Sequence, residues 1–369
     1  MSRWAWADVD LDSIRRNVEV LCAVAAPARL WAVVKADGYG HGAIAVAGAA
    51  LDGGATGLCV ALVQEGVALR EAGFDCPILV LSAQPASELP AAIRAALDLT
   101  VYSGEQLVEI ASAGGTRHPV HLKIDTGMRR VGASTSEAIE IASAIVESPA
   151  VRFAGVCTHL AIADEPDDPF TAAQLETFER VLDAAATDGD DIPMVHAANS
   201  AATLAFPAAR FDMVRVGIAI YGISPGPALD EMCSSLEPAL SLRARVSHVK
   251  RVDPGDRISY GLRHTFRRSA TVATLPLGYA DGVSRRLFVA GGEVLLGGVR
   301  RPIVGVVTMD QMMVDCGDDA VAVGDEAVLI GRQGGEVITA NELGQRLGTI
   351  GYEVVCGISS RIERRYTRG

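Results

Sequence analysis

The sequence predicts an α/β protein with a (β/α)8 barrel of the TIM type followed by a C-terminal all-β domain. Short apolar runs alternate with longer, alanine-rich amphipathic segments from about residue 30 to residue 225. This pattern is typical of a parallel sheet with helical crossovers. Eight such units fit into about 200 residues, which is enough to close a barrel. After about residue 235 the apolar runs become β-branched and alternate with turn residues, which indicates a second, all-β domain.

The predicted barrel strands are residues 30–36, 56–61, 77–82, 97–103, 119–125, 152–160, 193–200 and 213–222. Helical periodicity is clearest at residues 63–73, 103–115, 134–148 and 170–189. An open doubly wound sheet is the alternative fold. Its glycine-rich phosphate turn would have to be "GYGHG" at residues 38–42, which does not match GxGxxG.

We place the domain boundary after residue 232, so that residues 1–232 form the barrel domain and residues 233–369 the β domain. The predicted β runs of the second domain are residues 240–252, 257–261, 269–280, 291–298, 300–316, 325–331 and 352–359. Residues 225–238 are the expected hinge. The strand-like residues 4–11 precede the barrel strands, and residues 1–12 could pair with either domain.

Composition excludes several classes of function. The 369-residue chain carries a net charge of −12 at pH 7, which argues against binding to nucleic acid or to an anionic membrane surface. The N-terminus lacks the apolar segment of a signal peptide, and no stretch is apolar enough for a membrane span. Seven cysteines form no CxxC pair, so we expect reduced thiols and a cytoplasmic location. We predict no metal site.

Polar residues stand at the ends of five predicted barrel strands, where the active sites of this fold lie. They are Lys35 in strand one, Lys123 in strand five, His159 in strand six, Asn199 and Ser200 in strand seven, and Arg215 with Gly217 in strand eight. Any one of them fits a structural role. Five strands that direct polar groups to one rim predict a functional site.

The types of these residues predict a cofactor. Lysine is rare in this chain, and the apolar residues before Lys35 should desolvate its amine, lower its pKa and allow it to condense with a carbonyl. Ser200 and the amides of Gly217 and Ile218 suit a phosphate, and Arg215 suits a ring nitrogen. Together they point to pyridoxal 5′-phosphate. A phosphosugar aldolase would share the lysine and the phosphate site but would not need the arginine.

Motifs along almost the whole chain resemble those of bacterial alanine racemases in order and spacing. They include "AVVKADGYGHGA", "HLKIDTGMRRVG", "HAANSAAT", "DMVRVGIAIYGISP", "ISYG", "GYADG", "TMDQMM" and "GYEVVCGIS". The resemblance implies a PLP-dependent isomerase that interconverts L-alanine and D-alanine and supplies D-alanine for peptidoglycan. It also implies a head-to-tail homodimer, in which the β domain of one subunit completes the barrel mouth of its partner.

The resemblance implies a role for each matched residue. Lys35 would carry the cofactor as an aldimine and act as one proton-transfer base, and Tyr260 would be the base on the opposite face of the substrate. Arg215 would bond the pyridine nitrogen, with His159 between the ring and this arginine. The residues implied to hold the phosphate are Tyr39, Ser200, Gly217, Ile218 and Tyr352.

The remaining implied residues serve the substrate. Arg130 would reach the cofactor's phenolic oxygen or the substrate carboxylate, and the Met309 amide, beside Asp310, would also contact the carboxylate. Lys123 matches a lysine that is often carbamylated and positions the arginine. Tyr279 either lines the entry to the site or simply packs.

Other activities stay open at this point. A racemase of the same class could prefer serine or a basic amino acid, since a methylene or a hydroxyl is only weakly discriminated. A fold-related decarboxylase would need a catalytic cysteine in the β domain, and a non-catalytic PLP carrier would resemble the barrel alone. The paired presence of Tyr260 and "TMDQMM" favours the racemase.

The sequence departs from the family pattern at a few positions. Val216 and Gly351 stand where the family usually has proline, and Arg263, His264 and Phe266 are unusual after "ISYG". Every implied catalytic residue is nevertheless present.

Overall fold

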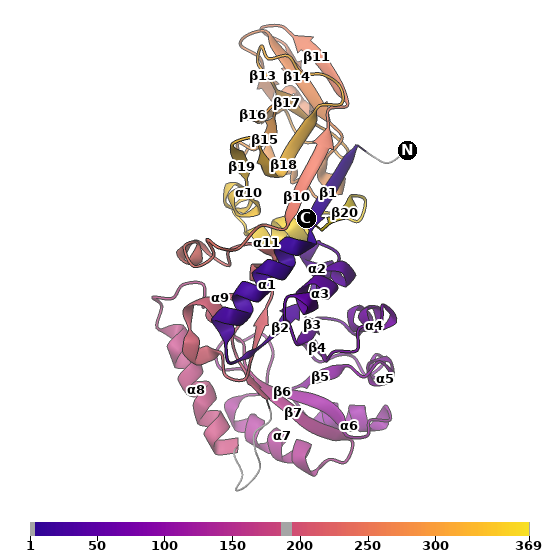
Figure 1. Ribbon diagram of the computed structural model, residues 1–369, viewed down its shortest axis with the longest axis vertical. Helices are drawn as coiled ribbons and strands as arrows, with labels where there is room; N and C mark the ends of the chain where they lie inside the picture. The colour runs from indigo at the N-terminus through magenta and orange to yellow at the C-terminus, as the bar shows by residue number, and fades with distance from the viewer. Residues whose placement is uncertain (1–3, 186–193, 369) are drawn as a thin grey trace. The chain divides into compact units, whose positions relative to one another are not determined.

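The computed structural model describes residues 4–185 and 194–368, which divide into two compact units (Figure 1). One unit comprises Ser13–Gly38 and Ala43–Glu237, and the other comprises Met1–Asp12, Tyr39–Gly42 and Pro238–Gly369. The end of the helix predicted at residues 170–189, and the first residue of the strand predicted at 193–200, lie outside the described residues. Within those residues, no helix is both long and apolar enough to cross a bilayer.

The first unit contains an eight-stranded parallel sheet in the order β8-β7-β6-β5-β4-β3-β2-β9. Its strands are β2 (Arg29–Val33), β3 (Gly57–Val60), β4 (Ile78–Val80), β5 (Asp98–Val101), β6 (His118–Lys123), β7 (Val151–Cys157), β8 (Met194–His196) and β9 (Met213–Val216). The amide of Arg215 donates to the carbonyl of Ala198 at 2.9 Å and links the two ends of this order. The predicted barrel is therefore confirmed.

Helices cover the outside of this sheet (Figure 1). They are α1 (Leu11–Ala25), α3 (Ala43–Asp52), α4 (Val63–Glu71), α5 (Leu89–Arg94), α6 (Gly104–Ser112), α7 (Thr135–Glu147), α8 (Phe170–Ala185) and α9 (Ser200–Ala205). The segment labelled α2 (Lys35–Tyr39) is a left-handed turn after β2. All four predicted helices are present. Local chemistry explains where they begin: at α7 the Ser134 hydroxyl accepts from the Glu137 amide while the Glu137 carboxylate accepts from the Ser134 amide, a capping box.

The second unit is mostly β. Its main sheet has the order β11-β14-β17-β16-β15-β18-β10-β1-β20, and β19 pairs with β18. The strands are β1 (Ala5–Asp10), β10 (Leu240–Arg245), β11 (His248–Val252), β14 (Ala270–Leu275), β15 (Glu293–Leu296), β16 (Val299–Val304), β17 (Met312–Asp315), β18 (Glu326–Gln333), β19 (Glu336–Ile338) and β20 (Glu363–Thr367). A separate hairpin joins β12 (Arg257–Ile258) and β13 (His264–Thr265). The N-terminal strand β1 pairs antiparallel with β10 and parallel with β20.

Two short helices of this unit were not predicted, α10 (Ala340–Leu347) and α11 (Gly351–Cys356). The prediction of a β run at residues 352–359 was wrong. The buried residues there are Gly351, Val355 and Ile358, whose spacing of four and three residues fits one face of a helix. A Cβ at position 351 would lie 2.1 Å from Asn341 Oδ1, so glycine lets the Asn341 side chain lie against this position.

The unusual residues after "ISYG" also have a structural reason. Phe266 is buried in a satellite cluster with Val252, Val272 and Val304. The ring of His264 lies edge-on to the Phe266 ring at 4.7 Å between centroids. These residues therefore pack the hairpin that carries the "ISYG" motif.

Candidate active site

Lys35 follows the first barrel strand, two residues beyond the end of β2, and its side chain is half-buried. The backbone then turns left-handed, with φ of 53° at Ala36, 52° at Asp37 and 50° at Tyr39, a conformation that costs energy for non-glycine residues. Two hydrogen bonds hold this turn. The Ala36 amide donates to Glu65 Oε1 at 2.7 Å, and the Ala43 amide donates to Asp37 Oδ1 at 2.9 Å.

Arg215 on β9 is buried, with 6% of its surface exposed. Its guanidinium donates to four acceptors: His196 Nδ1 at 2.6 Å, the Thr158 carbonyl at 2.8 Å, the Ala197 carbonyl at 3.0 Å and His159 Nδ1 at 3.4 Å. Four partners on separate atoms leave the guanidinium little freedom, so Arg215 is a rigid, permanently charged donor.

The two histidines beside Arg215 are neutral at neutral pH. Burial lowers the pKa of His159 and of His196 well below 6.5, and the positive charge of Arg215 lowers both further. A neutral imidazole has an acceptor nitrogen, as its hydrogen bond with Arg215 requires. His196 was not among the predicted site residues, although a histidine inside a predicted barrel strand was a signal for it.

Lys123 at the end of β6 is buried, and its pKa is lowered. Desolvation is the main cause, and the charges of Arg215, Arg130 and Lys35 also lower the pKa of Lys123, whereas Cys157 raises it. Arg130 itself is exposed in the loop after β6. The Asp125 carboxylate shapes this loop by accepting from the amides of Gly127 and Arg129 at 2.9 and 3.1 Å.

Ser200 lies against the turn after β9. Its buried hydroxyl oxygen accepts from the Gly217 amide at 2.9 Å and from the Ala219 amide at 3.4 Å. Asn199 caps α9, since its side-chain oxygen accepts from the Ala202 amide at 3.0 Å. The chain thus brings Ser200 and Gly217 together, with Ile218 as the next residue, at the ends of β8 and β9.

Tyr39 and Tyr352 are neighbours within the second unit, with ring centroids 6.2 Å apart. The segment that carries Tyr39 is held close to α11: a Cβ on Gly40 would lie 2.3 Å from the Val355 carbonyl oxygen. The Gly40 carbonyl also accepts from Arg364 Nε at 2.9 Å. Arg364 is therefore a supporting residue that no sequence motif singled out.

Tyr260 belongs to the second unit, and Lys35 belongs to the first. Tyr260 is 71% exposed on the hairpin of β12 and β13. The flanking residues Ser259 and Leu262 have φ of 64° and 48°, and the Ser259 hydroxyl donates to the Val306 carbonyl at 2.7 Å. The turn is strained but anchored, and it presents the tyrosine outward.

Met309 and Tyr279 lie on two loops that hydrogen-bond to each other. The amide of Tyr279 donates to the Thr308 carbonyl at 2.9 Å, and that of Ala280 donates to the Met309 carbonyl at 3.0 Å. A Cβ on Gly278 would lie 2.3 Å from that same Met309 oxygen, so only glycine allows this approach.

A charged contact braces the same region. Arg361 Nη2 donates to Asp310 Oδ1 at 2.6 Å, and Arg361 Nε lies 3.5 Å from the buried Asp281. Asp281 in turn accepts from the Gly278 amide at 2.9 Å. Arg361 and Asp281 were not predicted as site residues. Asp281 lies in the "GYADG" motif, but no local pattern indicates its contact with Arg361, which is distant in the sequence.

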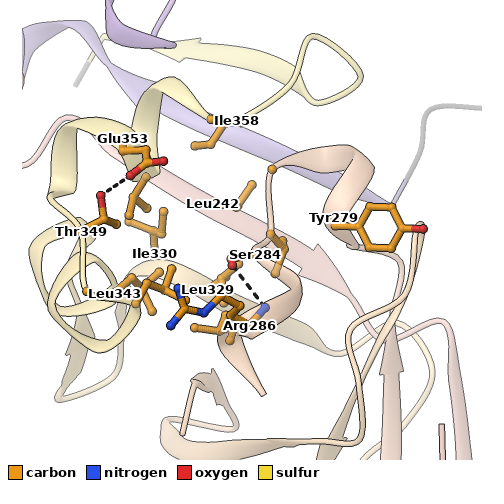
Figure 2. A pocket seen from close by; sticks show the side chains of 17 residues that line it. Leu242, Tyr279, Ser284, Arg286, Leu329, Ile330, Leu343, Thr349, Glu353 and Ile358 are labelled. Carbon is orange, nitrogen blue, oxygen red and sulfur yellow. Dashed lines mark hydrogen bonds between the residues drawn. The ribbon is translucent and has the colours of Figure 1, made fainter. Parts of the chain in front are cut away.

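The second unit also contains a cavity of about 520 Å³ between β10, β18, α10, α11 and the turn at Arg285–Leu287 (Figure 2). Its walls are mainly leucine, isoleucine and valine. Glu353 accepts a hydrogen bond from the Thr349 hydroxyl, and Arg286 donates its amide to Ser284 Oγ at 3.3 Å. The Tyr279 ring lies at one edge and points away from the other labelled side chains. No sequence signal pointed to this cavity.

Comparisons with known proteins agree across both units. Residues 9–225 match the family model for the alanine racemase N-terminal domain, and residues 239–366 match the model for its C-terminal domain. An alanine racemase of Symbiobacterium thermophilum is 47% identical over 99% of this chain and 97% of its own length. One of Thermobifida fusca is 44% identical over 100% of this chain and 99% of its own length.

Solved structures match equally well. The alanine racemase of Bacillus anthracis with bound L-Ala-P superposes with a TM-score of 0.94 at 40% identity, covering 100% of this chain and 96% of that chain. That of Streptomyces coelicolor superposes with a TM-score of 0.93 at 40% identity, covering 99% and 98%. The enzyme class predicted from the motifs is confirmed: this chain belongs to the alanine racemase family.

Proposed function

We propose that the residues at the carboxyl ends of the barrel strands bind pyridoxal 5′-phosphate, and that Lys35 and Tyr260 exchange the α-proton of alanine. The observation that carries this proposal is the rigid Arg215. A buried guanidinium held by four acceptors can donate a hydrogen bond to an aromatic ring nitrogen without transferring its proton to that nitrogen.

The chemistry of the donor set fits this cofactor. Lys35 offers an amine for the aldehyde, and the Ser200 hydroxyl and the Ile218 amide would offer neutral donors for the phosphate. The Gly217 amide, which donates to Ser200 Oγ, would orient that hydroxyl. Tyr39 and Tyr352 offer two neighbouring hydroxyls for the same group. When bound, the cofactor supplies an electron sink for the negative charge that develops on the substrate α-carbon.

Arg215 would hold the pyridine nitrogen in its unprotonated form. A guanidinium has no acceptor and does not release its proton at neutral pH. His159 contacts Arg215 as a neutral imidazole, so it would add no competing charge beside the ring. An unprotonated ring nitrogen would limit how far the negative charge of the α-carbon spreads into the pyridine ring. This limit would favour return of the proton to the α-carbon over side reactions.

Racemisation needs a base on each face of the substrate. Lys35 Nζ would take or return the proton on one face, and the Tyr260 hydroxyl on the other. Arg130 and the Met309 amide would orient the substrate carboxylate, with Asp310 held by Arg361 beside them.

We propose that the second base comes from a partner subunit in a head-to-tail homodimer. The 71% exposure of Tyr260 supports this, because a proton-transfer group works best where water is excluded. Several apolar side chains of the same unit are also exposed, namely Leu262, Tyr279, Met309 and Ile350. A partner barrel would cover them.

We further propose that Lys123 is carbamylated and positions Arg130. Carbamylation requires the neutral amine, and the lowered pKa of Lys123 increases the neutral fraction. The resulting carboxylate would meet the positive field of Arg130. The amine would add carbon dioxide and release a proton, and the carbamate would be lost again in acid. Electron density of active enzyme at neutral pH that shows an unmodified Lys123 would contradict this proposal.

D-alanine for peptidoglycan is the proposed product in the cell. We propose a cytoplasmic location. The seven cysteines support this, because all of them lie in the described residues and none forms a disulfide, as is typical of a reducing compartment.

One experiment tests the mechanism and the substrate together. Single enantiomers of alanine, serine, lysine and glutamate are incubated with the purified protein in heavy water, and deuterium at Cα is followed. Alanine should exchange and racemise fastest, Lys35→Ala should abolish both processes, and Tyr260→Phe should slow them from one enantiomer at least. Unchanged rates in Tyr260→Phe would exclude it as a base, and faster exchange of another amino acid would overturn the specificity for alanine.

A further inference from the structure

A line of buried polar side chains leads from Arg215 through the interior of the barrel to Asp98. Arg215 Nη1 lies 2.6 Å from His196 Nδ1, His196 Nε2 lies 2.9 Å from His121 Nδ1, and His121 Nε2 lies 3.3 Å from Asp98 Oδ2. The four residues come from β9, β8, β6 and β5. The proposed mechanism uses only the first of them.

The two ends of this line favour the same direction for every hydrogen bond in it, because the Arg215 guanidinium only donates and the Asp98 carboxylate only accepts. A guanidinium has only donors, so His196 Nδ1 must accept and His196 must carry its proton on Nε2. His121 Nδ1 then accepts from His196, which places the His121 proton on Nε2, where it donates to the Asp98 carboxylate. Both histidines are therefore expected to be Nε2–H tautomers.

The strand between the two histidines leaves space for their hydrogen bond. Strand β7 lies between β6 and β8 in the sheet, so His121 and His196 meet across an intervening strand. The residue of β7 that pairs with His121 is Gly155, and a Cβ there would lie 2.4 Å from His121 Nδ1. The register of β6 against β7 also shifts between Val120 and His121, and such an irregularity re-aims the side chain.

The far end of the line supplies a negative charge. In the described part of the chain Arg215 forms no ion pair with a carboxylate, although it is buried, and a buried charge is costly without a counter-charge or good acceptors. Asp98 is the carboxylate at the end of the line, and its side chain is only 15% exposed. The Trp31 ring packs edge-on against the His121 ring at 6.2 Å and shields the middle of the line.

We propose that His121 and Asp98 are positioning residues for Arg215. Asp98 stabilises the Nε2–H tautomer of His121 and, through the hydrogen bond between the two rings, the Nε2–H tautomer of His196 that accepts from Arg215. Without Asp98, only the Arg215 contact would select between the two tautomer pairs that satisfy the His121–His196 hydrogen bond. These hydrogen bonds hold the guanidinium in place, and the negative charge of Asp98 attracts its positive charge toward the barrel interior. This inference rests on the proposed contact between Arg215 and the cofactor ring for its effect on catalysis, but the tautomers can be tested without that contact.

The first test is nitrogen NMR of the wild-type protein labelled with ¹⁵N-histidine, with and without pyridoxal 5′-phosphate. His121 and His196 should both show the Nε2–H pattern in both samples. An Nδ1–H pattern at His196 would overturn the proposal without any variant.

The second test uses Asp98→Ala, Asp98→Asn and Gly155→Ala, with exposed Asp75→Ala as the matched control. Asp98→Ala should mix the tautomers of both histidines and lower kcat for alanine about tenfold at unchanged KM, the effect of one hydrogen bond in a charged network. Asp98→Asn keeps an acceptor oxygen and should restore the tautomers. Gly155→Ala should disturb the signals of both histidines, and Asp75→Ala should change nothing.

The outcomes separate this inference from the proposed function. Wild-type tautomers in Asp98→Ala would overturn the line while leaving the racemase mechanism intact. Altered tautomers with an unchanged kcat would overturn the positioning role. Full activity in Arg215→Ala would show that catalysis does not need the contact between Arg215 and the cofactor. This result would refute the proposed function but would not affect the tautomers measured in the wild-type protein.

Discussion

The rings of Tyr39 and Tyr352 lie 6.2 Å apart at an angle of 53°, although they are at opposite ends of the sequence. Tyr39 follows the first barrel strand, and Tyr352 is in helix α11 of the mostly-β unit. Their pairing means that two hydroxyls proposed for one phosphate come from distant parts of the chain.

Tyr39→Phe and Tyr352→Phe should each weaken the binding of pyridoxal 5′-phosphate about tenfold, because each removes one hydrogen bond to a charged group. The double variant should lose less than the product of the two effects, since the residues are close enough to couple. Titration of cofactor-free protein, followed by absorbance, measures the Kd. An unchanged Kd in both single variants would remove these residues from the phosphate site.

Arg215→Lys should destabilise the protein by about 2–3 kcal/mol and lower kcat. Lysine has three donors for the four acceptors that Arg215 satisfies, and an unsatisfied buried acceptor near a charge costs energy of this order. Urea unfolding measures the change in the free energy of unfolding. Exposed Arg129→Lys should be neutral, and a similarly neutral Arg215→Lys would show that the four contacts contribute little.

Stability should fall as the pH drops below 6.5. The folded-state pKa values of His159 and His196 are lowered well below 6.5, so in acid the unfolded chain takes up protons that the folded chain does not. The free energy of unfolding is therefore not reduced by these histidines above pH 6.5, and it falls as the pH drops from 6.5 toward their folded-state pKa values. The fall is up to about 1.4 kcal/mol per pH unit for each histidine.

Denaturant unfolding between pH 7.5 and 5 checks this pH dependence. His196→Gln cannot take up a proton and should flatten the curve, whereas exposed His248→Gln should leave the slope unchanged. An unaltered slope in His196→Gln would mean that His196 takes up no extra proton on unfolding.

Gly278→Ala should destabilise the fold by about 2 kcal/mol or more and raise KM, because the new Cβ would lie 2.3 Å from the Met309 carbonyl oxygen and displace its loop. Thermal unfolding and steady-state kinetics measure the two effects. Gly48→Ala is the matched control: position 48 lies within α3 with no atom within 4 Å of the added Cβ, so alanine should stabilise slightly. A fully active, stable Gly278→Ala would show that the loop adapts.

Mixing two variants that are each impaired in racemisation should raise the activity if the sites are shared. Lys35→Ala and Tyr260→Phe each lack one base, but a mixed dimer has one site in which both bases are wild type. Random exchange of subunits should recover about one quarter of the wild-type activity. Each variant alone, treated identically, is the control, and no recovery after verified exchange would contradict the shared site.

The fold class and most of the candidate site could be predicted because their signals are local. Barrel strands buried on both faces are continuous apolar runs, and the residue that follows such a run must stand at the mouth. Lys35, Lys123, His159 and Ser200 are the proposed site residues that were identified in this way. The order of the motifs then indicated the family, which the full-length relatives confirmed.

What the sequence determined by itself is the alternation of strands and helices and the chemistry at the strand ends, since both depend on neighbouring residues. Tertiary structure alone decided three features. Residues 351–356 form a helix because Gly351 and Val355 share a buried face, and β1 joins the second sheet because it pairs with β10 and β20. His121 reaches His196 because Gly155 leaves space in the strand between them. Each of these three features depends on contacts between residues that are distant in the chain, so no local sequence pattern predicts it.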